Sequence, residues 1–216
     1  MTRLAHSRFV NALTFARVPL IFVWAALAVV HEFLRGPSGA DHIGLAVAAG
    51  VAMFLAGLTD AWDGALARKW NVVSTLGKMA DPLMDKVFYI VAFPVITWQV
   101  VHQGGNEFHA LLMVCFTVLY MLRDTWVTFM RSVGALYGAD VAAMWLGKVR
   151  TALSFPGAGW IYFYLALHRV LPAAWERPLL VSCYVVEVGL ILLTLWSLHT
   201  YTQAYLPYLK KALERN

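Results

Sequence analysis

Four aspartates between residues 60 and 85 are the part of this 216-residue sequence whose types and spacing best suit chemistry. Asp60 and Asp63 are three residues apart, and Asp81 and Asp85 are four residues apart. Side chains at either spacing share one face of a helix. If the chain turns back between the two pairs, all four carboxylates converge. Four negative charges gather in a medium of low dielectric only when cations accompany them.

Two kinds of cation meet this requirement. Basic side chains of the same segment could neutralise the carboxylates, so that the aspartates form structural ion pairs. These basic residues are Arg68, Lys69, Lys78 and Lys86. Divalent metal ions are the second kind. Carboxylate oxygens without His or Cys suit Mg²⁺ or Mn²⁺ and do not suit Zn²⁺. Two such ions bridged by carboxylates stabilise the charge that develops in phosphoryl transfer.

The rest of the sequence is typical of an integral membrane protein. It is 61% hydrophobic and only 13% charged, with a mean hydropathy of +0.65, whereas a soluble domain is about half apolar and a quarter charged. Apolar windows occur at residues 18–30, 43–59, 87–101, 108–122, 151–168 and 179–205. We predict an all-α, polytopic membrane protein with six transmembrane helices, a short interfacial helix at residues 2–9 and a single domain over residues 1–216.

These helices must position the aspartates. The second helix is expected to continue through Asp63 to about Arg68, and the third to begin near Asp81 with Pro82 in its first turn, where a missing N–H costs nothing. The link of roughly a dozen residues makes the two helices antiparallel neighbours. The two pairs of carboxylates then meet near one membrane surface.

The distribution of Lys and Arg predicts which surface this is. Basic residues concentrate on the side of the two termini and the aspartate segment, and the opposite loops carry only Arg35, Arg169 and Arg177. The positive-inside rule therefore places the aspartates on the cytoplasmic side. An alternative interpretation of the first 28 residues is a secretory signal peptide. The polar string NALTFAR before the apolar run argues against it.

The aspartate segment also carries a family signature. It reads Asp60-x2-Asp63-Gly64-x2-Ala67-Arg68-x8-Gly77-x3-Asp81-x3-Asp85, which resembles the signature of the CDP-alcohol phosphotransferases at all eight specified positions. These six-helix membrane enzymes displace CMP from a CDP-linked alcohol with the hydroxyl group of a second alcohol. The resemblance implies that the four aspartates bind two Mg²⁺ or Mn²⁺ ions and that Asp85 takes the proton of the attacking hydroxyl.

The same resemblance implies that Gly64, Arg68 and Ser74 contact the CDP portion. The residue types agree with this role, because a glycine lets a nucleotide approach the helix and an arginine can bind phosphate oxygens with two N–H groups.

Two further stretches are similar to bacterial phosphatidylglycerophosphate synthases. The stretch NALTFARVPL (11–20) implies that Asn11, Thr14 and Arg17, spaced by three, line the nucleotide-lipid pocket. The alternative is a polar helix start whose arginine reaches the membrane interface. Residues 122–151 align more loosely, and the similarity implies that the acceptor phosphate is bound by Arg123, Arg131, Lys148 and Arg150. The alternatives are charges that only set topology and, for Arg123, a buried pair with Asp124.

The resemblance implies transfer of a phosphatidyl group from CDP-diacylglycerol to the 1-hydroxyl of glycerol 3-phosphate, which releases CMP and gives phosphatidylglycerol phosphate for phospholipid biosynthesis. It implies a homodimer in the bacterial inner membrane. The expected partners are membrane lipids, and no nucleic acid is expected to bind. The acceptor could instead be inositol phosphate, another polyol phosphate or an amino alcohol. A small cation transporter would spread acidic residues across the bilayer, whereas only Glu187 lies deep in an apolar window.

Overall fold

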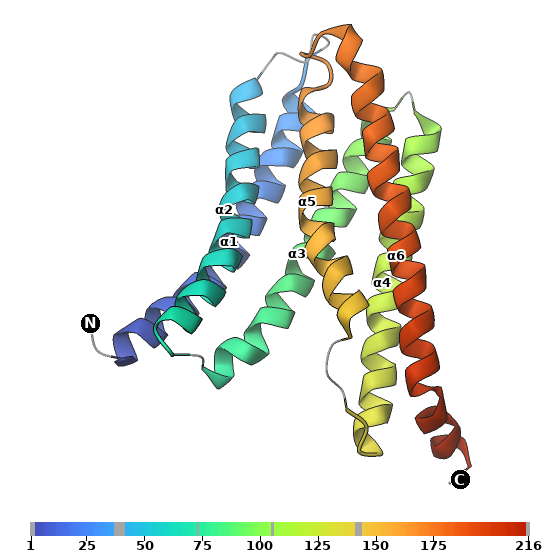
Figure 1. The fold of residues 1–216 in the computed structure, drawn as a ribbon. Helices are drawn as coiled ribbons and strands as arrows, with labels where there is room; N and C mark the ends of the chain where they lie inside the picture. The colour runs from blue at the N-terminus through green and yellow to red at the C-terminus, as the bar shows by residue number, and fades with distance from the viewer. Residues whose placement is uncertain (1–2, 37–41, 73, 105, 141–143, 215–216) are drawn as a thin grey trace. The chain divides into compact units, whose positions relative to one another are not determined.

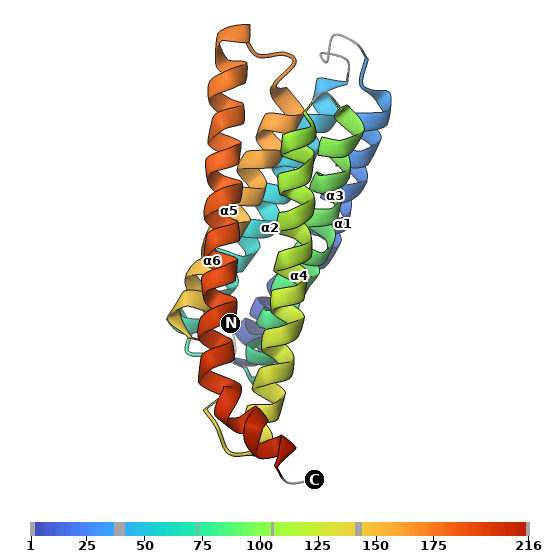
Figure 2. The ribbon, with the colours of Figure 1, turned by 90° about the vertical axis from the view of Figure 1, so that its right-hand side faces the viewer.

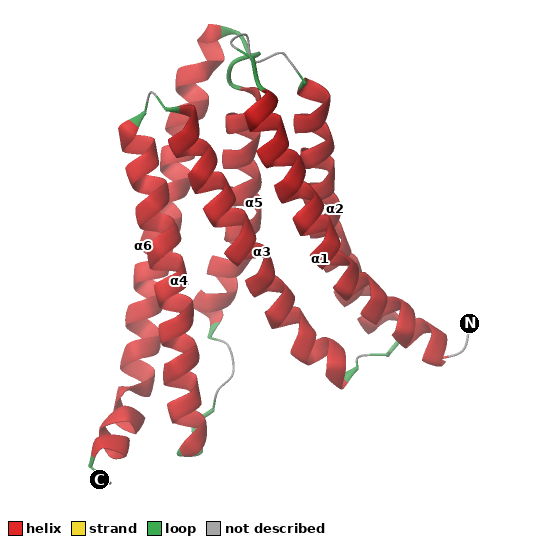
Figure 3. Cartoon of the chain, turned by 180° about the vertical axis from the view of Figure 1, so that it is seen from behind, coloured by secondary structure: helices red, strands yellow, loops and turns green. Residues whose placement is uncertain are grey.

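The computed structural model describes residues 3–36, 42–72, 74–104, 106–140 and 144–214, and Figure 3 shows that this part of the chain is helical throughout apart from short links. The described helices are α1 (Arg3–Leu34), α2 (Ile43–Lys69), α3 (Thr75–Gln103), α4 (Glu107–Leu136), α5 (Trp145–Leu167) and α6 (Ala173–Leu213). The predicted all-α fold is confirmed. The helix expected at residues 2–9 is, in the described part, the beginning of α1.

Five of these helices are long and apolar enough to cross a membrane, namely α1, α2, α4, α6 and the part of α3 from Pro82. The sixth, α5, has 23 residues and carries Lys148 and Arg150 in its first two turns. Large apolar side chains such as Phe33, Phe54 and Trp196 are more than half exposed. Such outward apolar surfaces are what a lipid environment accommodates.

The chain divides into two compact units. Unit 1 comprises residues 1–103 and 158–179, and unit 2 comprises residues 104–157 and 180–216. Unit 1 therefore contains α1, α2, α3 and the end of α5, and unit 2 contains α4, the start of α5 and most of α6.

In unit 1, α1 and α2 lie side by side (Figure 1). Buried alanines on α2 recur every three or four residues, at positions 46, 49, 52 and 56. Small residues at this spacing let two membrane helices approach closely. Trp24 of α1 is fully buried, with its ring edge-on to Tyr162 of α5 at a centroid distance of 5.6 Å.

In unit 2, α4 and α6 run side by side in the same direction (Figure 2), because α5 carries the chain back between them in sequence. Hydrogen bonds join the two helices along their length, from Asn106–Tyr184 at one end to Trp126–Thr202 further along. The core beneath contains Val127, Met130, Tyr201 and Tyr205.

Candidate functional site

The helix ends that carry the aspartates lie in unit 1. Asp60 and Asp63 are in the last turns of α2, as predicted. The third helix begins at Thr75, six residues before the predicted position, so Pro82 lies within α3 and not in its first turn. Ser74 explains the earlier start. Its hydroxyl accepts a hydrogen bond from the Gly77 N–H at 2.9 Å, which is the capping contact that starts helices.

One arginine contacts three of the four aspartates. The Arg17 guanidinium forms an ion pair with Asp60, and it lies 3.1 Å from Asp63 Oδ2 and 3.3 Å from Asp85 Oδ1. Its side chain is only 3% exposed. Thr14, one turn earlier on α1, donates a hydrogen bond of 2.8 Å to Asp63. The face of α1 that carries Thr14 and Arg17 therefore contacts the aspartates directly.

Structural ion pairs within the segment would take their counter-charge from its own basic residues. The structure shows that Arg17, from a helix outside the segment, also pairs with these aspartates. Three carboxylates around one guanidinium leave an excess of negative charge, so this pairing does not neutralise the cluster. The side chain of Asp81, like those of residues 75, 76, 78 and 79, lies outside the described part of the structure.

The other residues expected to bind the nucleotide lie beside this cluster. Ser74 donates a hydrogen bond of 2.9 Å to Asn11 Oδ1, which ties the start of α1 to the start of α3. The Arg68 guanidinium folds back over Gly64, where an added Cβ would lie 3.4 Å from Arg68 Nη1. Arg68 is otherwise exposed. The six residues that the resemblance assigns to the nucleotide-lipid pocket thus lie on α1, on α2 and immediately before α3, all in unit 1.

The donor set suits hard divalent cations, because it consists of carboxylate oxygens that carry more negative charge than Arg17 offsets. Among the side chains that the structure describes, no three acidic, His or Cys groups are arranged to hold one metal ion. Asp60, Asp63 and Asp85 each face the guanidinium instead. The ligand type and the negative charge of these residues therefore suit Mg²⁺ or Mn²⁺. In this structure the three described carboxylates contact Arg17.

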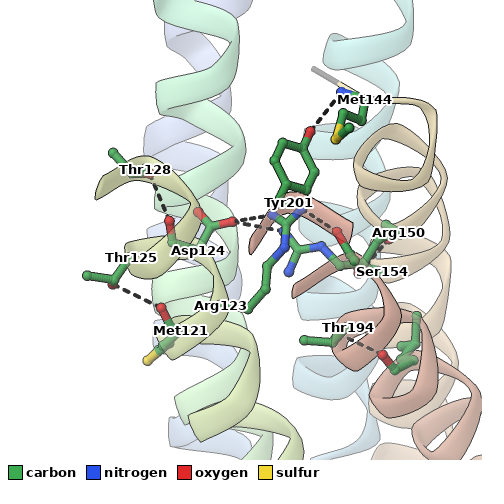
Figure 4. A network of polar contacts seen from close by, with 12 residues as sticks. Met121, Arg123, Asp124, Thr125, Thr128, Met144, Arg150, Ser154, Thr194 and Tyr201 are labelled. Carbon is green, nitrogen blue, oxygen red and sulfur yellow. Dashed lines mark hydrogen bonds and ion pairs between the residues drawn. The ribbon is translucent and has the colours of Figure 1, made fainter. Parts of the chain in front are cut away.

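A second charged cluster lies in unit 2. Arg123 and Arg150 share one oxygen of Asp124, at 3.2 and 2.8 Å (Figure 4). Only 5% of Arg123 and 2% of Arg150 is exposed. The ion pair between Arg123 and Asp124, one of the alternatives considered from the sequence, is therefore present. Asp124 also pairs with Arg150, so two positive charges share one carboxylate and the cluster has an excess of positive charge.

The remaining two basic residues expected to bind an acceptor are less buried than these arginines. Lys148 is exposed in the first turn of α5, and Arg131 is half-buried on α4. Gly147, the partner of Lys148 in the sequence, is packed tightly. An added Cβ there would lie 2.9 Å from the Tyr201 hydroxyl and 3.2 Å from Arg123 Nη2.

Sequence reasoning missed the contribution of α6. Ser197 accepts a hydrogen bond from Arg123, whose guanidinium carbon also lies 5.0 Å from the centre of the Tyr201 ring. Glu187, which had no assigned partner, is fully buried 2.6 Å from His109 Nε2. A lone acidic residue in an apolar window signals such a partner, but the sequence does not identify it.

Comparison with known proteins agrees with this chemistry. The sequence model of the family described as CDP-alcohol phosphatidyltransferase matches residues 9–210, which spans both units. Two relatives named CDP-diacylglycerol–glycerol-3-phosphate 3-phosphatidyltransferase, from Shigella flexneri serotype 5b (strain 8401) and Escherichia coli (strain K12), are 27% identical to this chain over 159 residues. The aligned region covers 73% of this chain and 78% of each relative. The chain belongs to the CDP-alcohol phosphatidyltransferase family.

Proposed function

We propose that this enzyme transfers the phosphatidyl group of CDP-diacylglycerol to the 1-hydroxyl of glycerol 3-phosphate, which releases CMP and forms phosphatidylglycerol phosphate. The observation that carries the proposal is the buried cluster of Arg123, Arg150 and Asp124, which has an excess of positive charge. An acceptor that carries a phosphate group requires such a site. The names of the relatives in Shigella and Escherichia favour the same acceptor.

Unit 1 would bind the donor. Gly64 leaves the surface of α2 open beside the Arg68 guanidinium, whose N–H groups suit the oxygens of a diphosphate. Asn11 and Ser74 form a hydrogen-bonded pair that can exchange partners with a nucleotide. The apolar outer surfaces of the helices would accommodate the acyl chains.

The four aspartates would hold two Mg²⁺ or Mn²⁺ ions, which would supply charge stabilisation for the phosphoryl group in the transition state. Asp85, whose side chain is 39% exposed, would accept the proton of the attacking hydroxyl. Asp63 is held by Thr14 and Arg17 and is 5% exposed, so its role would be to anchor the cluster and not to exchange protons with solvent.

In unit 2, Arg123, Arg150, Lys148 and Arg131 would bind the phosphate of the acceptor. Asp124 would bridge and orient the two buried guanidinium groups, since both donate to its Oδ1. We expect a multi-pass protein of the inner membrane, with the aspartates on the cytoplasmic side and a homodimer as the assembly.

The discriminating experiment is an acceptor panel with purified protein and CDP-diacylglycerol. Glycerol 3-phosphate, inositol phosphate and serine are supplied separately, CMP release is followed, and the lipid product is identified by mass spectrometry. We expect release with glycerol 3-phosphate and phosphatidylglycerol phosphate as the product. Faster release with either other acceptor would overturn the acceptor assignment and leave the family assignment intact.

A further inference from the structure

The basic cluster of unit 2, which we define as Arg123, Asp124 and Arg150, retains hydrogen-bonding capacity. The Nε atoms of both arginines and Nη1 of Arg150 are buried and have no hydrogen-bond partner among the described residues. Buried donors of this kind are costly unless a partner arrives. Since the cluster has an excess of positive charge, that partner is expected to be an anion.

Tyr201 of α6 contacts Arg123 of this cluster and the residue that precedes α5. Its ring lies under the guanidinium of Arg123, with 5.0 Å between the guanidinium carbon and the ring centre. Its hydroxyl oxygen accepts a hydrogen bond of 2.7 Å from the backbone N–H of Met144, the residue that precedes α5 (Figure 4). One side chain therefore connects an arginine of α4 to the start of the helix that carries Lys148 and Arg150.

Gly147 makes this connection possible. It lies against both the Tyr201 hydroxyl and Arg123 Nη2, so that a Cβ would meet the two groups at 2.9 and 3.2 Å. Contacts below about 3 Å require something to shift, and here the phenol is fixed because it is 2% exposed and stacked on Tyr205. The glycine thus lets the first turn of α5 approach the arginine.

We propose that Tyr201 is a positioning residue for the acceptor phosphate. It sets the orientation of Arg123 and the position of the first turn of α5, and so aligns the guanidinium groups that receive the anion. This inference rests on the proposed function. It adds a residue of α6, which lies outside the three stretches that resemble the family, to the determinants of acceptor binding.

The test is Tyr201→Phe, which keeps the ring and removes only the hydroxyl. The change leaves the Met144 N–H without its partner and loosens the start of α5. We expect the KM for glycerol 3-phosphate to rise about five- to tenfold, as for the loss of one buried hydrogen bond. The KM for CDP-diacylglycerol should stay within twofold of the wild-type value.

The matched control is Tyr162→Phe, in the part of α5 that belongs to unit 1. Tyr162 is also buried and also loses one hydroxyl bond to the backbone, in this case to the carbonyl of Ala46. A comparable fall in thermal stability but an unchanged KM for glycerol 3-phosphate is expected, which separates positioning from general destabilisation.

A double-mutant cycle with Gly147→Ala adds a second readout. The added methyl group collides with the hydroxyl in the wild type and meets less obstruction in Tyr201→Phe, so the two changes should raise KM by less than the product of their separate effects. Protection by inorganic phosphate, measured as a rise in the unfolding midpoint, requires no turnover and should be weaker in Tyr201→Phe.

The outcomes separate the two claims. Absence of turnover with glycerol 3-phosphate in the wild type would refute the proposed acceptor, and the phosphate measurement would then still decide the role of Tyr201. An unchanged KM and unchanged phosphate protection in Tyr201→Phe, or equal rises in KM for both substrates, would overturn the positioning role.

Discussion

Replacing Arg17 by glutamine should destabilise the enzyme through the aspartates that are left behind. The guanidinium is buried, and of its partners Asp63 is 5% exposed while Asp60 and Asp85 are 55% and 39% exposed. Removing one partner of a buried pair costs about 3–5 kcal/mol, whereas exposed pairs contribute about 0–1 kcal/mol. The contact with Asp63 therefore dominates the expected loss.

We expect a loss of about 3 kcal/mol, near the lower end of that range, because Thr14 still donates a hydrogen bond to Asp63 in the variant. For a protein of this size, such a loss lowers the unfolding midpoint by about 6–12 °C. The assay is tryptophan fluorescence during heating in detergent with EDTA present. Arg8→Gln, an exposed arginine of the same helix, is the control and should change stability by less than about 0.5 kcal/mol.

Two additions identify the cause of the loss. Asp63→Asn in the Arg17→Gln background removes the stranded charge and should recover most of the stability. Mn²⁺ in place of EDTA should reduce the difference between Arg17→Gln and the wild type, because divalent ions would then offset the aspartates. An Arg17→Gln variant as stable as the wild type in EDTA, or a double variant no more stable than the single one, would refute the reasoning.

Three further predictions concern other parts of the chain. His109→Ala should lower stability by about 3 kcal/mol in chemical unfolding, because it strands the fully buried Glu187; His109→Leu with Glu187→Leu should be less damaging than His109→Ala alone. Gly134→Ala should cost about 1–3 kcal/mol, because the methyl group would lie 2.6 Å from a tyrosine ring of α6, whereas Gly50→Ala, with open space around it, should not destabilise. Burial and nearby arginines lower the pKa of His168, so the unfolded chain binds this proton more readily; stability should fall as pH drops below about 6.5, and less steeply in His168→Gln, as thermal scans across pH would show.

Local features of the fold could be predicted from the sequence. Apolar length and the three- and four-residue spacings of the aspartates placed the helices and put Asp60 and Asp63 at the end of α2. The spacing of Thr14 and Arg17 likewise predicted a shared face, and both contact Asp63. These features depend on neighbours within a few turns, for which helix geometry is sufficient.

Contacts between distant segments could not be predicted in the same way. Arg17 meets Asp63 and Asp85 across 46 and 68 residues of chain, and no spacing rule selects it over the lysines of the segment itself. Arg123 contacts Ser197, which is 74 residues away in the sequence. Ser197 lies in a stretch of α6 where single polar residues are scattered among apolar ones, so no pattern marks it. The start of α3 differs from the prediction, because Pro82 is typical of a first helical turn whereas Ser74 caps the helix one residue before Thr75.

The proposed function depends on four aspartates that act with divalent ions to transfer a phosphatidyl group to glycerol 3-phosphate. The most direct measurement is formation of phosphatidylglycerol phosphate by the purified wild type and by Asp63→Ala and Asp81→Ala, each with Mg²⁺, with Mn²⁺ and with EDTA. We predict product only in the wild type with a divalent ion, from variants that remain folded by tryptophan fluorescence. Product formed in EDTA, or by either variant at the wild-type rate, would contradict the claim.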